Sequence, residues 1–249
     1  MLFVSDTANR RVAVARHDGG FVRAIDSYDT DEKFQSISGI CASNGELFVV
    51  DSEAHCVVVL TLEGQWLRTL KGVEADDGKF NQPHGVCAAD DTVLIADTHN
   101  HRVVVMRRSG AFVCTFGKFG KGRGEFHCPF GVALHGESVF VADTFNHRVV
   151  ITDLQGSHFI YLGDDTFALG HFMYPCHVFC DGTHVFVTDR ANHRVVVVDL
   201  EGQPICQFGK PDEMKRPTGA WVYGVDVFVA DSGNCRVLHC RSLKLTDSH

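Results

Sequence analysis

The sequence lacks any long hydrophobic run. Its apolar stretches, such as Val103 to Met106, fall far short of the roughly 20 residues that a membrane-spanning helix needs. Met1 leads directly into Leu2, without a basic segment or a small-residue cleavage site, so we expect no secretory signal. We therefore predict a cytoplasmic chain with no membrane partner.

Positive charge is also scarce. The chain has 23 Lys and Arg against 31 Asp and Glu, a formal net charge of -8. This balance disfavours broad contact with a phosphate backbone but leaves room for a local basic patch. Motifs of catalysis are lacking too: the sequence has no glycine-rich phosphate loop, nucleophile elbow or paired-cysteine metal spacing. We predict a protein that is not an enzyme and carries neither a cofactor nor a metal.

Cysteine, in contrast, is plentiful. Most of the ten cysteines stand singly among Val and Phe, where a free thiol behaves as a small hydrophobic side chain. Cys41 and Cys87 occupy one position of a repeat, and Cys114 and Cys206 occupy another. This recurrence predicts packing roles rather than disulfides or nucleophiles.

A repeat runs through the whole chain. An aspartate followed by a small polar turn recurs at intervals of 45, 46, 46, 46 and 42 residues, and prolines keep the same register from Pro83 to Pro217. A period of this size is typical of stacked supersecondary units. The approximate units within the single domain 1–249 are 1–36, 37–82, 83–128, 129–174, 175–216 and 217–249.

Each unit predicts four short strands, a to d. In the third unit these are 85–88, 92–96, 102–106 and 111–116, which are rich in β-branched residues and show no helical stripe. Six such meanders predict an all-β fold, a six-bladed β-propeller of four-stranded antiparallel blades; a solenoid is the competing geometry. Strand a of the first blade and strand d of the last are missing. We expect a piece of a longer polypeptide, or else a ring with a three-stranded seam.

The turn between strands b and c carries the most specific motif. It reads Asp-Thr-His-Asn-His-Arg at 97–102, Asp-Thr-Phe-Asn-His-Arg at 143–148 and Asp-Arg-Ala-Asn-His-Arg at 189–194. The chain resembles the NHL repeat family over its full length, although the first, second and sixth units depart from Asn-His-Arg. The resemblance implies a docking platform for protein or, in some members, RNA, including the substrate-recognition part of ubiquitin ligases.

We interpret the repeated polar residues as structural. Each aspartate is expected to accept backbone N–H bonds of its turn and to pair with the arginine that opens the next strand. Histidines 101, 147 and 193 occur once per blade, so they are too far apart for a zinc site. The residues with predicted structural roles are Asp97, Asn100, Arg102, Asp143, Asn146, Arg148, Asp189, Asn192 and Arg194.

Binding is predicted on the face that carries the d-to-a and b-to-c loops, because the d-to-a loops are long and varied. An acidic sector contains Asp29, Asp31 and Glu32. A face divided into basic and acidic sectors is better suited to binding a protein or peptide than to binding a phosphate backbone. The alternative is that these loops are solvated and bind no ligand. The predicted ligand-binding residues are Lys118, Phe119, Lys121, Arg123, Lys210, Lys215 and Arg216.

A second candidate site lies where strand a begins. The position directly after the repeat proline holds a different residue in each unit. The next position is a glycine in the other units, but in one unit a histidine replaces it. We expect these residues at the mouth of a central channel; a packed or solvated role is the alternative for a lone histidine. They are His84, Phe130, Cys176, His177 and Thr218.

The leading hypothesis is a non-catalytic scaffold for protein–protein interaction, with ubiquitin-ligase substrate recognition as one form of it. An RNA-binding propeller is the first alternative. The second is suggested by Pro83-His84-Gly85-Val86, which looks like a ligand motif of the zinc-dependent peptidyl-hydroxyglycine amidating lyase. Phe145 stands where that family's catalytic tyrosine is expected, which disfavours the lyase.

Overall fold

The computed structural model describes residues 1–29, 32–72, 78–163 and 167–241. Over these residues the chain is all-β, with 24 strands and five single-turn 3-10 helices. It divides into two compact units, Met1–Lys118 and Phe119–His249. Within the described ranges, no helix has the length and hydrophobicity that crossing a membrane requires.

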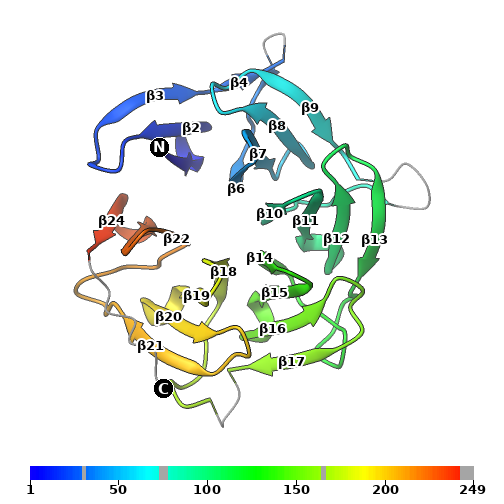
Figure 1. Ribbon diagram of the computed structural model, residues 1–249, viewed down its shortest axis with the longest axis vertical. Coiled ribbons are helices and arrows are strands. Elements are labelled where there is room, and N and C mark those ends of the chain that lie inside the picture. Colours follow the sequence, from blue (N-terminus) through cyan, green and yellow to red (C-terminus); the bar gives the residue numbers. More distant parts are fainter. Residues whose placement is uncertain (30–31, 73–77, 164–166, 242–249) are drawn as a thin grey trace. The chain divides into compact units, whose positions relative to one another are not determined.

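The first unit contains three antiparallel meanders, in which strands that follow one another in the chain pair side by side (Figure 1). A two-stranded pair, β4 (Ser27–Tyr28) and β5 (Glu32–Lys33), lies in the loop after the first meander. The strands of the meanders are β1 (Leu2–Asp6), β2 (Arg11–Ala15) and β3 (Phe21–Ile25); β6 (Ile37–Ser43), β7 (Glu46–Asp51), β8 (Cys56–Thr61) and β9 (Trp66–Leu70); and β10 (Val86–Ala89), β11 (Thr92–Asp97), β12 (Arg102–Arg107) and β13 (Phe112–Phe116).

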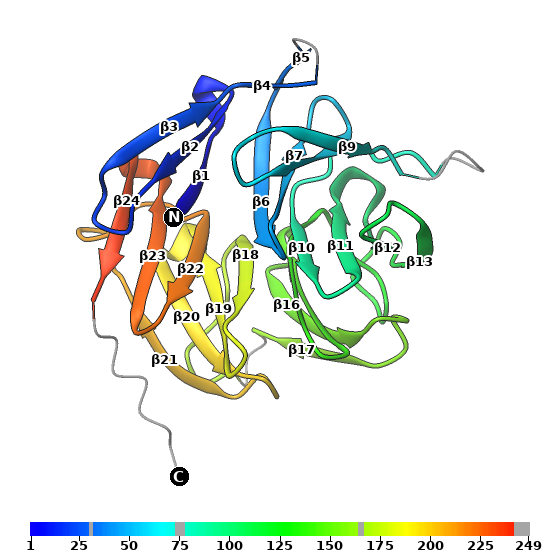
Figure 2. The same ribbon diagram turned by 45° about the horizontal axis from the view of Figure 1, so that its top comes forward.

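The second unit repeats this plan, and Figure 2 shows its last three strands side by side. Its meanders are β14 (Pro129–His135), β15 (Ser138–Asp143), β16 (Arg148–Asp153) and β17 (Phe159–Leu162); β18 (Pro175–Cys180), β19 (His184–Asp189), β20 (Arg194–Asp199) and β21 (Pro204–Phe208); and β22 (Gly219–Tyr223), β23 (Asp226–Asp231) and β24 (Arg236–Cys240). Four 3-10 helices join the second to the third strand of their meander: η2 (Thr98–Asn100), η3 (Thr144–Asn146), η4 (Arg190–Asn192) and η5 (Ser232–Asn234). A further one, η1 (Thr7–Asn9), joins β1 to β2.

The predicted fold class is confirmed. Six meander sheets follow one another, and among the described residues the first and last have three strands while the four between them have four. The four strands predicted for 83–128 match β10 to β13 to within one residue at each end. Over the described ranges, β1 to β3 correspond to strands b to d of a repeat and β22 to β24 to strands a to c, in agreement with the repeat arithmetic.

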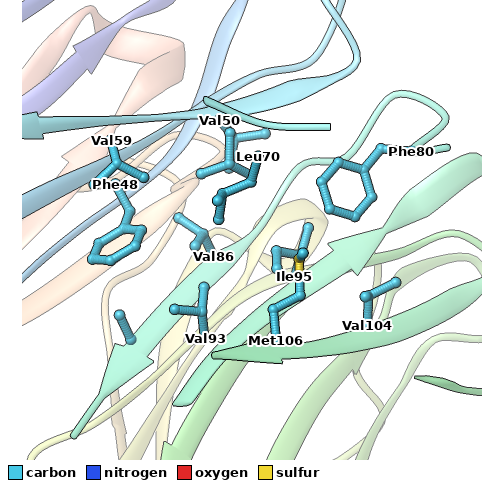
Figure 3. Packing of buried hydrophobic residues seen from close by; sticks show 12 residues of the cluster. Phe48, Val50, Val59, Leu70, Phe80, Val86, Val93, Ile95, Val104 and Met106 are labelled. Carbon is cyan, nitrogen blue, oxygen red and sulfur yellow. The ribbon is translucent and has the colours of Figure 1, made fainter. Parts of the chain in front are cut away.

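The core lies between neighbouring sheets. In the four-stranded sheets the second and third strands are buried over most of their length, as in β11, where Val93 to Ala96 are fully buried, because a blade packs on both of its faces. Phe48, Val50 and Val59 of one sheet pack against Val86 and Ile95 of the next (Figure 3). Each fully buried side chain of this kind contributes about 1.5–3 kcal/mol.

A glycine two residues after the repeat proline, or after Ile37 in the second repeat, allows the first strands to approach closely. The Gly39 N–H donates to the His84 carbonyl oxygen at 2.7 Å, and a Cβ on Gly39 would lie 2.3 Å from that oxygen. A Cβ on Gly131 would lie 2.7 Å from the His177 Cα. At the next junction, His177 itself has a side chain, and its Nδ1 accepts the Ala220 N–H at 3.4 Å. Neighbouring first strands are thus joined either by direct backbone contact or through the imidazole ring of His177.

Candidate functional site

The repeated aspartates fasten the turn between the second and third strands. Asp97 is fully buried and accepts hydrogen bonds from Arg102 Nε at 2.7 Å and Asn100 Nδ2 at 2.9 Å. The same bonds recur in the other two complete motifs, at Asp143 with Asn146 and Arg148 and at Asp189 with Asn192 and Arg194. The predicted aspartate–arginine ion pair is confirmed at all three positions.

The backbone donor differs from the prediction. We predicted that each aspartate binds N–H groups of its own turn, but the donors are the N–H groups of Asn81, His127 and Met173, two residues before the repeat proline. This correction has a physical reason. The turn already bonds to itself, since His101 N–H donates to the Thr98 carbonyl, so the carboxylate is free to bind the loop that precedes strand a.

The histidine of the motif links one repeat to the next. It occupies the left-handed region, with φ 56° at His147, and its Nδ1 accepts the Tyr174 N–H at 3.1 Å. His55 accepts the Gln82 N–H in the same way at 3.0 Å. A hydroxyl supports the link, because Thr144 Oγ1 donates to the Pro175 carbonyl at 2.7 Å. These histidines thus bond through Nδ1 to the residue before the next repeat's proline.

The loop with three of the six predicted basic residues is held in a fixed shape. Arg148 donates to the carbonyls of Lys121 and Glu125, both at 2.8 Å, and Asn146 donates to the Gly120 carbonyl at 2.8 Å. Phe126 of this loop is fully buried. The side chains of Lys118, Phe119, Lys121 and Arg123 are exposed. The repeat motif therefore presents these side chains to solvent on a rigid backbone.

An aromatic row begins in this loop. Ring centroids lie 5.1 Å apart between Phe119 and His127, 5.3 Å between His127 and Phe145, 5.6 Å between Phe145 and Tyr174, and 4.4 Å between Tyr174 and His147. Phe119 is 64% exposed and Phe145 is 44% exposed. Three of these four contacts are edge-to-face, a geometry in which aromatic rings stabilise one another. We call Phe119, His127, Phe145, Tyr174 and His147 the aromatic row.

The second predicted basic group is less available. Lys210 pairs within its own loop with Asp212 at 3.7 Å and Glu213 at 3.2 Å, and the Glu213 hydrogen bond raises the pKa of Lys210. Lys215 and Arg216 have exposed side chains, while their N–H groups donate to Asp231 and to His193. Of the acidic sector, Asp29 and Glu32 are exposed and Asp31 lies outside the described residues.

The residues predicted at a channel mouth have diverse environments. Phe130 lies 6.2 Å from Phe145 and so extends the aromatic row sideways. Cys176 Sγ lies 3.5 Å from the Pro217 carbonyl and Thr218 bonds to Ser232, which are contacts with or within the last repeat. His84 bonds to the Gln82 carbonyl. Only Phe130 of this set joins the row in the structure.

The two histidines of this set are held neutral by their surroundings. Burial lowers the pKa of His177 to about 4. Burial also lowers the pKa of His84, and the nearby His99 adds to the effect. In the part of the chain that the structure describes, no three His, Cys, Asp or Glu side chains are grouped so as to hold a metal ion.

Sequence reasoning missed most of the aromatic row. His127, Phe145 and Tyr174 fill repeat positions that hold unlike residues elsewhere: Asn81 corresponds to His127, His99 to Phe145 and Gln82 to Tyr174. The same criterion, a varied residue in a constant slot, selected the residues at the start of strand a. Applied to the turns and loops, this criterion finds His127, Phe145 and Tyr174.

Comparison with known proteins identifies the repeat. The family model of the NHL repeat matches residues 34–60 and 80–106. The chain is an NHL-repeat β-propeller. Its fold is similar to that of a chain in the crystal structure of a nidogen/laminin complex, with a TM-score of 0.72 and 14% identity over 99% of this chain and 91% of that one.

Other solved structures share the fold of this NHL-repeat chain. A protein of unknown function from Bacteroides caccae has a TM-score of 0.68 at 14% identity, covering 96% of this chain and 89% of that one. Selenomethionine-substituted virginiamycin B lyase from Staphylococcus aureus has a TM-score of 0.63 at 12% identity, covering 96% and 80%. Identities this low show the fold alone. No curated protein matches the sequence significantly.

Proposed function

We propose that this NHL-repeat chain is a non-catalytic scaffold that binds a protein or peptide through its d-to-a and b-to-c loops. The aromatic row is the observation that carries the proposal. Exposed aromatic rings on a fixed backbone bury large areas on binding at a low entropic cost, and such residues dominate binding energy at interfaces. Phe119 and Phe145 are the anchors, because they are the exposed phenylalanines of the row.

The basic residues beside the row define the chemistry of the partner. Lys118, Lys121 and Arg123 are exposed in the loop that carries Phe119. Cations at the rim of an interface steer an acidic partner and add specificity more than affinity. The proposed ligand is therefore an extended segment with acidic and apolar side chains, bound in the cytoplasm. Substrate recognition for a ubiquitin ligase is the finer assignment, and it rests on the family resemblance alone.

RNA is the second candidate ligand. Stacked aromatic rings next to Lys and Arg also suit single-stranded nucleic acid, whose bases stack on such rings. The net charge of -8 disfavours it, as the binding of a long phosphate backbone needs a continuous basic track. RNA is therefore a less favoured ligand than a protein.

The test is retention of ligands from a cytosolic extract by the full chain and by Phe145→Ala. Phe112→Ala is the matched control, because Phe112 is 45% exposed, like Phe145, but lies on β13 outside the row. For each purified partner we expect Phe145→Ala to weaken binding about tenfold or more. Phe112→Ala should leave the affinity unchanged.

Two further arms separate the candidates. Nuclease treatment of the extract abolishes retention if the ligand is RNA and leaves it intact if the ligand is a protein. The triple change of Lys118, Lys121 and Arg123 to Glu should slow association with an acidic partner and remove its salt dependence. Equal binding by Phe145→Ala, the triple variant and wild type would overturn the proposed site.

A further inference from the structure

Two cysteines from neighbouring sheets lie together at the first strands β6 and β10. Cys41 Sγ accepts the Ala88 N–H at 3.3 Å and lies 4.0 Å from the Ala88 carbonyl oxygen. Ala88 directly follows Cys87, so covalent geometry places the Cys87 Cα within roughly 6 Å of Cys41 Sγ. The Cys87 side chain also acts on Cys41 electrostatically, because its hydrogen bonding lowers the pKa of the Cys41 thiol. The repeat position that both cysteines share thus juxtaposes two thiols.

The neighbouring strands are held close at this place. Gly39 N–H donates to the His84 carbonyl at 2.7 Å, two to three residues before the cysteines on each strand. Both cysteines are half-buried rather than enclosed in the core. Disulfides form when Cα atoms lie about 4.4–6.8 Å apart, a separation consistent with these contacts. A small oxidant therefore meets a thiol that already has its partner beside it.

Cys41 also differs chemically from the other cysteines. The hydrogen bond from Cys87 lowers the pKa of the Cys41 thiol against the opposing effect of burial, and the Ala88 N–H and nearby Arg108 add to the lowering. Burial raises the pKa of thiols such as Cys114 and Cys206. Reaction with oxidants proceeds through the thiolate. Geometry and thiol chemistry thus single out the same residue.

We propose that Cys41 and Cys87 are a peroxide-oxidised pair that forms a reversible disulfide between β6 and β10. The Cys41 thiolate attacks hydrogen peroxide, an S–O bond forms as the O–O bond breaks, and the departing hydroxide takes a proton to become water. The Cys87 thiol then attacks the sulfur of this sulfenic acid, an S–S bond forms as the S–O bond breaks, and a second water leaves with the Cys87 proton. Two thiols and one peroxide give one disulfide and two waters.

This pair revises the sequence interpretation of both cysteines as packing residues only. Cys41 does pack against the core between β6–β9 and β10–β13, and the reduced form is the one present in a reducing compartment. Cytosolic disulfides are usually transient and redox-sensing. The bond is expected to form under oxidant and to be removed by thiol reductants.

The experiment uses the full chain with Cys235 changed to Ser, because Cys235 is the exposed cysteine and reacts between molecules. The protein is treated with stoichiometric peroxide and quenched. Peptide mapping without reduction should then find the peptide 34–68 linked to the peptide 80–102, with the loss of two hydrogen atoms. The melting temperature should rise by roughly 5–10 °C, because the link closes a loop, and should return on adding dithiothreitol.

Variants make the proposal falsifiable even where folding changes slightly. Cys87→Ser should stop the reaction at the sulfenic acid, which a dimedone probe traps on Cys41. Cys41→Ser should abolish both the trapped acid and the link. Cys114→Ser is the matched control and should still form the link. Linkage of another pair, or oxidation of other cysteines while Cys41 and Cys87 both remain free thiols, would overturn the assignment.

Discussion

Strands β20 and β24 occupy the same place in neighbouring repeats, but only β20 is covered by a fourth strand in the described residues. Arg194 and Arg236 donate to their aspartates at the same 2.7 Å, yet their side chains are 13% and 49% exposed. Val195 is fully buried, whereas Val237 is 41% exposed. Among the described residues, the aspartate–arginine pair therefore forms at both strands, and the pair on the strand that has a described fourth neighbour is the less exposed one.

The largest expected difference concerns the two aspartates. Asp189→Ala removes the partner of a covered arginine and of the Met173 N–H, and should lower the free energy of unfolding by about 3–5 kcal/mol. Asp231→Ala should cost about 1–3 kcal/mol, because Arg236 regains water. Urea unfolding of both variants measures the difference. Equal losses would show that strand d does not set the strength of the aspartate–arginine pair.

A second comparison separates the two ways of joining first strands. Gly131→Ala places a methyl group 2.7 Å from the His177 Cα, and should cost about 1–3 kcal/mol through overpacking. Gly219→Ala meets only Ala230 Cβ at 3.7 Å, an ordinary contact. Thermal melts of the pair should show a lower melting temperature for Gly131→Ala alone. A similar loss in both would mean that the backbones do not touch as described.

The two valines sharpen the comparison on the apolar side. Val195→Ala removes two buried methyl groups and should cost about 1.6 kcal/mol or slightly more. Val237→Ala should change stability by less than about 0.5 kcal/mol, because its side chain is already hydrated. The denaturant midpoints of the two variants measure the two losses of stability and so their ratio. A large loss in Val237→Ala would reveal a cover over β24.

The last comparison concerns the pH dependence of stability at His177. Burial lowers its pKa to about 4 in the folded state, while the unfolded chain has a value near 6.5. As pH falls from about 6.5 to 4 the unfolded state takes up the proton first, so stability declines over this window. His177→Gln should remove the part of that decline that this histidine causes. An unchanged pH profile of stability would contradict a buried neutral His177.

Contacts that recur in each repeat can be predicted from the sequence, whereas contacts between residues of separate segments are missed. Asp97, Asn100 and Arg102 recur at fixed spacing, so their partnership follows from one repeat read against another. The donor from Asn81 was misplaced, because it is 16 residues away and nothing in the local turn points to it. The aromatic row joins residues of three separate segments, 119–127, 145–147 and 174. Such convergence depends on loop conformation, which spacing alone does not encode.

The bonds between repeats are out of phase with the repeats themselves. Ser52 of one repeat donates to the carbonyl of Pro83, which opens the next, and Thr144 does the same for Pro175. Cutting the chain between two sheets therefore breaks two hydrogen bonds at once: the one that the hydroxyl donates to the proline carbonyl and the one that the histidine accepts from the next repeat. Gene duplication in this frame copies a unit whose stability is completed only by its neighbour. Recombination or truncation at sheet boundaries is consequently costlier than strand pairing suggests, and transplanted blades need to carry the following proline segment with them.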